Sequence, residues 1–175
     1  MTMLTRRWFP ALAALLFAGG AAWAKDNAAH ADAAFMKKAA ESGLAEVQAS
    51  QLAATKATHT QVKSFAQQMV DDHTKANDEL KALAGAKGVE LPAEPSMAQK
   101  AKLKLLQGAE GADFDKRYAR DFGVKAHEDT VSLFQKESRR SKDAEVKAWA
   151  DKTLPKLQHH LEMAKDMAKA VDAGK

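Results

Sequence analysis

The chain has 175 residues, 46% of them hydrophobic, and a formal net charge of +4 at pH 7, a length that corresponds to about one domain. It contains no cysteine, which excludes disulfides, iron–sulfur clusters, c-type haem attachment and a thiol nucleophile. Lysines and acids are interspersed along the chain, so we expect no basic face for a nucleic acid.

The first two dozen residues differ in composition from the rest. Arg6 and Arg7 are followed by an apolar run over residues 11–22, and Ala22-Trp23-Ala24 then places small residues where signal peptidase cleaves. The run is shorter than the roughly 18 residues of a membrane-spanning helix. We therefore predict a signal peptide over residues 1–24 and one domain over residues 25–175, exported to the periplasm or associated with the outer envelope.

The export route has two interpretations. Thr5-Arg6-Arg7-Trp8-Phe9 resembles the twin-arginine motif, which exports proteins that have already folded. The general secretory route is favoured, because Pro10 and Ala11 stand where that motif usually continues with leucine and lysine.

Residues 25–175 have the composition of a helical protein, rich in alanine, lysine, glutamate, glutamine and leucine. Apolar residues three and four apart predict helices over residues 29–54, 61–86 and 97–138, and a last helix that ends near Val171. The third helix is expected to break near Gly108 or Gly111, and Ser141 or Asp143 to cap the last one.

These helices predict an all-α, antiparallel four-helix bundle. Short connections place consecutive helices antiparallel, and the longer, proline-containing segment after residue 88 still permits an up-down-up-down order. No stretch after residue 24 is long and apolar enough to cross a membrane.

Polar residues interrupt the apolar face of each predicted helix. His73, His127 and His160 lie on the apolar faces of the second, third and fourth helices, and Glu46 lies on that of the first. We counted residues from the end of the bundle that holds the first and third turns, at about 1.5 Å per helical residue. Along the bundle axis the three histidines then lie roughly 21 to 28 Å from that end, and Glu46 lies roughly 16 Å from it. Imidazole and carboxylate ligands suit zinc, iron, copper or nickel, so these four residues are candidate ligands of a transition-metal ion, with zinc or iron as the ions we name.

The alternative is that these histidines only pack as neutral, buried residues. In that case stability should decline as the pH falls from about 7 to 5, because unfolding then binds protons. His30, His59 and His159 lie off the apolar faces and are expected in solvent. Asp71, Asp72 and Glu128 neighbour the candidate ligands, and they are either orienting partners or exposed acids.

Several sequence segments resemble one known family. They include Gly43 to Val47 (GLAEV), Val62 to Ala66 (VKSFA) leading to Met69 to His73 (MVDDH), Phe114-Asp115 with Tyr118, His127, and Leu154-Pro155 followed by His160-Leu161. Together they resemble the bacterial "domain of unknown function 4142" family of exported, ferritin-like bundles, often labelled outer-membrane proteins. The resemblance implies the fold and an envelope location and leaves the activity open.

A ferritin-like fold raises the question of a di-iron site. Such sites take Glu-x-x-His from two helices, but Val70 and Leu157 stand three residues before His73 and His160, so we do not expect one. Three functions remain, in this order: a non-enzymatic module that binds a metal ion or small ligand, a structural or protein-interaction module of the envelope, and a metal-dependent enzyme. The protein partner and the oligomeric state are left open.

Overall fold

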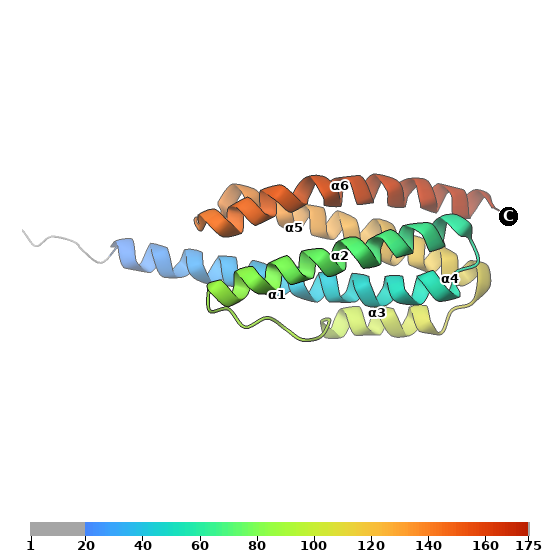
Figure 1. The fold of residues 1–175 in the computed structure, drawn as a ribbon, viewed down its shortest axis with the longest axis horizontal. Coiled ribbons are helices and arrows are strands. Elements are labelled where there is room, and N and C mark those ends of the chain that lie inside the picture. Colours follow the sequence, from blue (N-terminus) through green and yellow to red (C-terminus); the bar gives the residue numbers. More distant parts are fainter. Residues whose placement is uncertain (1–19, 175) are drawn as a thin grey trace, which may run out of the picture.

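The computed structural model describes residues 20–174, with side chains from residue 29 onward, and that part of the chain is all-α with no strand (Figure 1). The chain order is α1 (Gly20–Lys56), α2 (Thr60–Ala86), α3 (Met97–Gln107), α4 (Gly111–Tyr118), the π-helical segment η1 (Ala119–Lys125), α5 (Ala126–Arg140) and α6 (Ala144–Ala173). Most of the predicted signal peptide lies outside the described residues. The break predicted in the third helix is confirmed at Gly108–Glu110.

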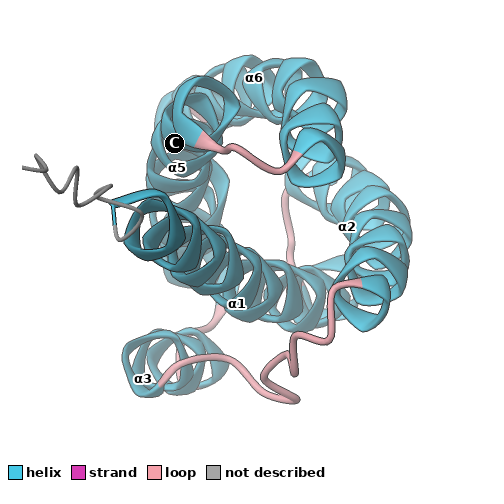
Figure 2. Cartoon of the chain, turned by 90° about the vertical axis from the view of Figure 1, so that its left-hand side faces the viewer, coloured by secondary structure: helices cyan, strands magenta, loops and turns pink. Residues whose placement is uncertain are grey.

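Four rods form the bundle, and the third of them is α4, η1 and α5 in succession. Viewed along its length, the ring runs α1, α2, α6, α5, and each rod is antiparallel to both neighbours (Figures 1 and 2). The contacts agree, because α1 packs on α2 and α5 while α6 packs on α2, η1 and α5. The predicted antiparallel four-helix bundle is thus the observed architecture.

The up-down-up-down order, which the sequence permits, is not the order of the structure. The rod from α4 to α5 begins beside Ala57 and Val62 and ends beside Phe35, so it runs parallel to α2. The cause is α3, which carries the chain back along the outside of the bundle before the third rod begins. Figure 2 shows α3 outside the ring, against α1, with which it shares its main contacts. The first part of the predicted third helix therefore does not belong to the bundle.

Local sequence explains where the helices begin. Ser96 and Gln99 form a reciprocal capping box at the start of α3. Asp143, one of the two predicted caps, accepts hydrogen bonds from the backbone N–H groups of Glu145 and Val146 at the start of α6. Asp115 accepts the backbone N–H groups of residues 58 and 59 and so holds the α1–α2 connection against α4.

The core is divided into two apolar clusters along the bundle axis. One contains Met69, Phe122 and Ala164, and the other contains Leu80, Val131 and Leu157, among further residues. On three rods the residue between the two clusters is a candidate ligand: His73, His127 and His160. On α1, Glu46 lies between Ala40 of one cluster and Ala49 of the other. A polar layer therefore crosses the middle of the bundle.

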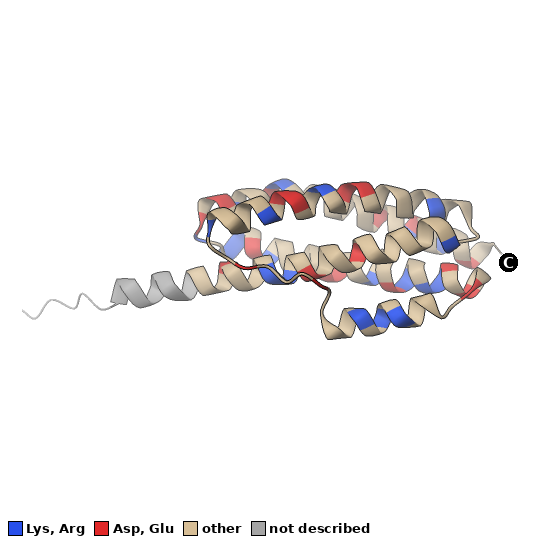
Figure 3. Cartoon of the chain, turned by 60° about the horizontal axis from the view of Figure 1, so that its bottom comes forward, with Lys and Arg blue, Asp and Glu red and all other residues tan. Residues whose placement is uncertain are grey.

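Charged side chains cover the outside. Lysines, arginines and acids alternate on the bundle helices, whereas α3 carries lysines and no acid (Figure 3). Within residues 20–174, no helix has the length and apolarity needed to cross a bilayer.

Candidate metal centre

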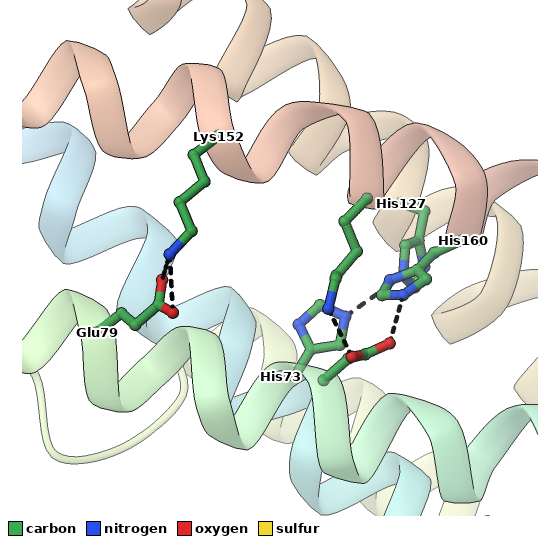
Figure 4. A network of polar contacts seen from close by, with 7 residues as sticks. His73, Glu79, His127, Lys152 and His160 are labelled. Atoms are coloured by element: carbon green, nitrogen blue, oxygen red, sulfur yellow. Dashed lines mark hydrogen bonds and ion pairs between the residues drawn. The ribbon is translucent and has the colours of Figure 1, made fainter.

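Three imidazole rings converge in the polar layer from three different rods. His73 of α2, His127 of α5 and His160 of α6 each offer one ring nitrogen, and these three nitrogens lie within 4.8 Å of one another. The Nε2 atoms of His73 and His127 are 3.4 Å apart. Figure 4 shows the three rings facing one another. The structure thus brings together the three histidines that the sequence singled out.

The three histidines meet even though the third rod runs in the direction opposite to the one expected. His73 lies 13 residues before the end of α2 at Ala86, and His127 lies 13 residues before the end of α5 at Arg140. Both are close to the middle of their rods. Reversing a rod about its centre leaves its central residue at the same depth, so the predicted layer survives the wrong topology.

Two of the rings are oriented through their outer nitrogens. The Nδ1 atom of His127 lies 2.7 Å from the carbonyl oxygen of Gly123, and since a carbonyl only accepts, Nδ1 carries the proton and Nε2 presents a lone pair. The Nε2 atom of His160 lies 3.0 Å from a carboxylate oxygen of Asp72, which leaves the lone pair on Nδ1. That Nδ1 atom is buried and has no hydrogen-bond partner. Histidines that bind metals are typically oriented by such carbonyl or carboxylate partners.

The carbonyl that orients His127 belongs to η1. The Nδ1 atom also lies 3.2 Å from the carbonyl oxygen of Phe122, so its two acceptors are both in the π-helical turn before α5. Insertions of a π-turn into α-helices occur frequently at functional sites. Gly123 also lets η1 approach α6, because a Cβ there would lie 2.9 Å from the Cε of Met167 and 3.4 Å from the Cβ of Ala164. One short segment therefore both orients His127 and sets its distance from the rod that carries His160.

The rings are removed from solvent. His127 and His160 are each 1% exposed and His73 is 7% exposed. Burial, followed by the neighbouring histidines, holds the pKa of His73 well below its usual range, and burial lowers the pKa of His127 to about 4. Burial also lowers the pKa of His160, although Asp72 opposes that shift. All three are therefore neutral at pH 7, the protonation state in which imidazole binds metal ions.

Glu46 lies in the same layer but outside the group of three. It is 3% exposed, and neither carboxylate oxygen has a hydrogen-bond partner. Burial raises its pKa well above the ordinary value, with Lys102 opposing the shift. Glu46 and His73 both line one small cavity of about 30 Å³ between the rods. The structure thus brings Glu46 to the wall of the same cavity as His73 and leaves the carboxylate out of the histidine group.

The other candidates separate clearly. Asp72 is an orienting partner, and its second oxygen accepts from Lys156 at 2.7 Å. Asp71 is exposed and Glu128 is exposed. His30 and His159 are in solvent, as expected, but His59 is half-buried, and its Nδ1 caps α2 by accepting from the backbone N–H of Gln61.

The group has the dimensions of a metal site. Two nitrogens bound to one tetrahedral zinc ion at about 2.05 Å lie about 3.3 Å apart, close to the 3.4 Å between His73 and His127. The third nitrogen lies within 4.8 Å of the other two, so its distances need to shorten by at most about 1.5 Å. Three imidazoles with an open fourth position form a ligand set known from zinc proteins.

The sequence matches the family described as "Domain of unknown function (DUF4142)" over residues 18–167. The chain belongs to this family. All three histidines, Glu46 and Asp72 lie within the matched part of this DUF4142 protein. No curated protein and no solved structure matches the chain. The ferritin-like relationship therefore stays a prediction, whereas the family and the helical bundle are established.

Sequence reasoning missed the π-helical turn and the cavity beside Glu46. Gly123, a glycine within a predicted helix and four residues before a candidate ligand, is the one signal that pointed to a local irregularity. The cavity gives no sequence signal, because residues from all four rods line it.

Proposed function

We propose that this DUF4142 protein binds one divalent transition-metal ion, zinc or iron, through His73, His127 and His160. It is a non-enzymatic binding module in this proposal, and export to the periplasm or outer envelope, with a signal peptide over residues 1–24, belongs to the same proposal. The location is supported by the basic, apolar and A-x-A segments at the start of the sequence.

One observation carries the metal proposal: two neutral, buried imidazoles direct a lone pair into the histidine group, and no residue outside that group donates a hydrogen bond to either lone pair. His127 donates from Nδ1 to Gly123, and His160 donates from Nε2 to Asp72. The Nε2–H group of His73 donates a hydrogen bond to the Nε2 lone pair of His127, and the Nδ1 atom of His160 has no hydrogen-bond partner. A buried acceptor without a partner costs about 1–3 kcal/mol, and a bound ion would remove that cost.

The ligand set also bears on the type of ion. Three neutral imidazoles without a carboxylate or thiolate suit the transition metals and disfavour calcium and magnesium, which prefer oxygen ligands. Closing the group around an ion requires His73 to carry its proton on Nδ1 instead of Nε2, a change of tautomer that releases no proton.

Elemental analysis of tag-free protein purified from the periplasm tests the proposal. We expect near-stoichiometric zinc or iron in the wild type and none in a His73→Ala, His160→Ala double variant. The matched control is a His30→Ala, His159→Ala double variant, which removes two exposed histidines and should keep the metal.

The contrary result is also informative. If the wild type holds no metal and does not bind zinc or iron in titrations, the histidines are packing residues. The envelope-module function then becomes the better account, and the search turns to protein partners. Recovery of the protein only in the cytoplasm with residues 1–24 intact would contradict the export part.

A further inference from the structure

Three features of the molecule remain unexplained by a three-histidine site: a buried carboxylate without partners, a cavity beside it, and a helix outside the bundle. Leaving a charged or polar group unpaired in the interior is costly. Both carboxyl oxygens of Glu46 are buried without a hydrogen-bond partner. A site made only of histidines gives no reason to retain it.

The position of α3 creates a groove on the outside of the bundle. This groove, of about 450 Å³, is bounded by α1, α3, η1 and α5. On one side Gln99 of α3 donates a hydrogen bond from Nε2 to the hydroxyl of Ser42 on α1, at 3.3 Å. Had α3 continued into the bundle, as the sequence first indicated, this groove would have no outer wall.

The groove and the small interior cavity share part of their walls. Ser42, Glu46 and Thr130 line both. On the inner side the cavity reaches His73. The three shared residues are therefore the partition between the solvent-facing groove and the space beside the histidines, and each presents an oxygen atom. At about 30 Å³ the cavity has room for about one water molecule, or an ion of similar size.

We propose that this groove and cavity form the access route of the metal ion, and that Glu46 is a transient oxygen ligand for the ion between solvent and His73. This inference rests on the proposed metal site. Burial favours the protonated carboxyl of Glu46, so an arriving cation displaces that proton to solvent and binds the two oxygens, which no other group occupies. The carboxyl takes up a proton again when the ion moves on. The ion then passes to the three imidazoles, which are better ligands for a transition metal.

The groove is lined by three carboxylates and three lysines: Glu41, Asp121, Asp129, Lys38, Lys102 and Lys136. Their charges cancel, so a cation meets no net repulsion there. The opposite approach, past Asp72, is less suitable, because the ammonium of Lys156 lies 2.7 Å from that carboxylate and covers it.

Rates and affinity together test the route. Cobalt(II) is mixed with metal-free, tag-free protein in a stopped-flow instrument, and the rate of binding is measured from the visible absorbance of the bound ion. The rate of cobalt release is measured from the decay of that absorbance after a chelator is added. We expect Glu46→Gln, which keeps the size of the side chain, to slow both binding and release by about tenfold or more while the dissociation constant changes less than about twofold. Thr130→Leu, which adds bulk to the partition without altering Glu46, should slow both rates in the same way.

Glu90→Gln is the matched control. It makes the same exchange at an exposed glutamate that lines neither the groove nor the inner cavity, so both rates should stay within about twofold of the wild type.

Each other outcome overturns a distinct statement. Unchanged rates in Glu46→Gln and Thr130→Leu would show that the ion enters elsewhere. A larger dissociation constant together with faster release in Glu46→Gln would show that Glu46 is a permanent ligand of the bound ion and not a transient ligand on the route. Absence of cobalt binding by the wild type would refute the metal site itself, and the access route with it.

Discussion

The buried, neutral state of His127 gives the sharpest test of the structure. Its pKa is about 4 in the folded protein, and an unfolded histidine has a pKa of about 6.5. A group whose pKa is lowered by folding stabilises the fold above the unfolded value, and that contribution is lost as the pH falls from about 6.5 through the folded value. Between pH 7 and pH 5, the loss from His127 amounts to about 2 kcal/mol.

The wild-type curve alone does not isolate this contribution. Two carboxyl groups act with the opposite sign, because burial raises the pKa of Glu46 and, together with Asp32, raises that of Glu137 to about 7. Such groups stabilise the fold more as the pH falls from 7 towards 5. The decline expected from the sequence, which considered only histidines, is therefore partly offset.

A comparison with His127→Gln removes the offset, since both proteins carry the same carboxyl groups. Urea unfolding is measured for both in the presence of a chelator at pH 7 and pH 5. The variant should be less stable at pH 7, because a packed ring is lost. The difference in free energy of unfolding between the wild type and the variant should be about 2 kcal/mol smaller at pH 5 than at pH 7. A gap that stays constant within about 0.5 kcal/mol would refute a buried, neutral His127.

Two further predictions concern the groups that orient the histidines. Asp72→Asn should weaken binding of zinc about 10- to 100-fold, because the carboxylate that orients His160 is lost; isothermal titration measures this, and an unchanged affinity would remove Asp72 from the site. Gly123→Ala should destabilise the protein by about 1 kcal/mol in urea unfolding, because the added Cβ displaces the flexible end of the buried Met167 side chain. Gly85→Ala is its control, with no atom near the added Cβ, and should stabilise by about 0.5–1 kcal/mol; equal effects of the two changes would contradict the close approach at Gly123.

The helices and their buried faces could be predicted from the sequence. Apolar residues at a spacing of three and four define one side of a helix whatever that side packs against, and caps such as Asp143 act within a few residues. The same periodicity placed His73, His127 and His160 on inward faces. Their common layer followed because they lie near the middle of their rods.

Only the tertiary structure decided the direction of the third rod and the position of α3. The apolar face of α3, with Leu103 and Leu106, fits equally well inside a bundle or against the outside of α1, and the local sequence does not distinguish the two. The outer position of α3 reverses the third rod and builds the groove that leads to Glu46. The hydrogen bond between His160 and Asp72 and the cavity depend on distances between rods, which residue spacing along one helix does not contain. The π-helical turn that orients His127 lies within one rod, but a single glycine does not specify it.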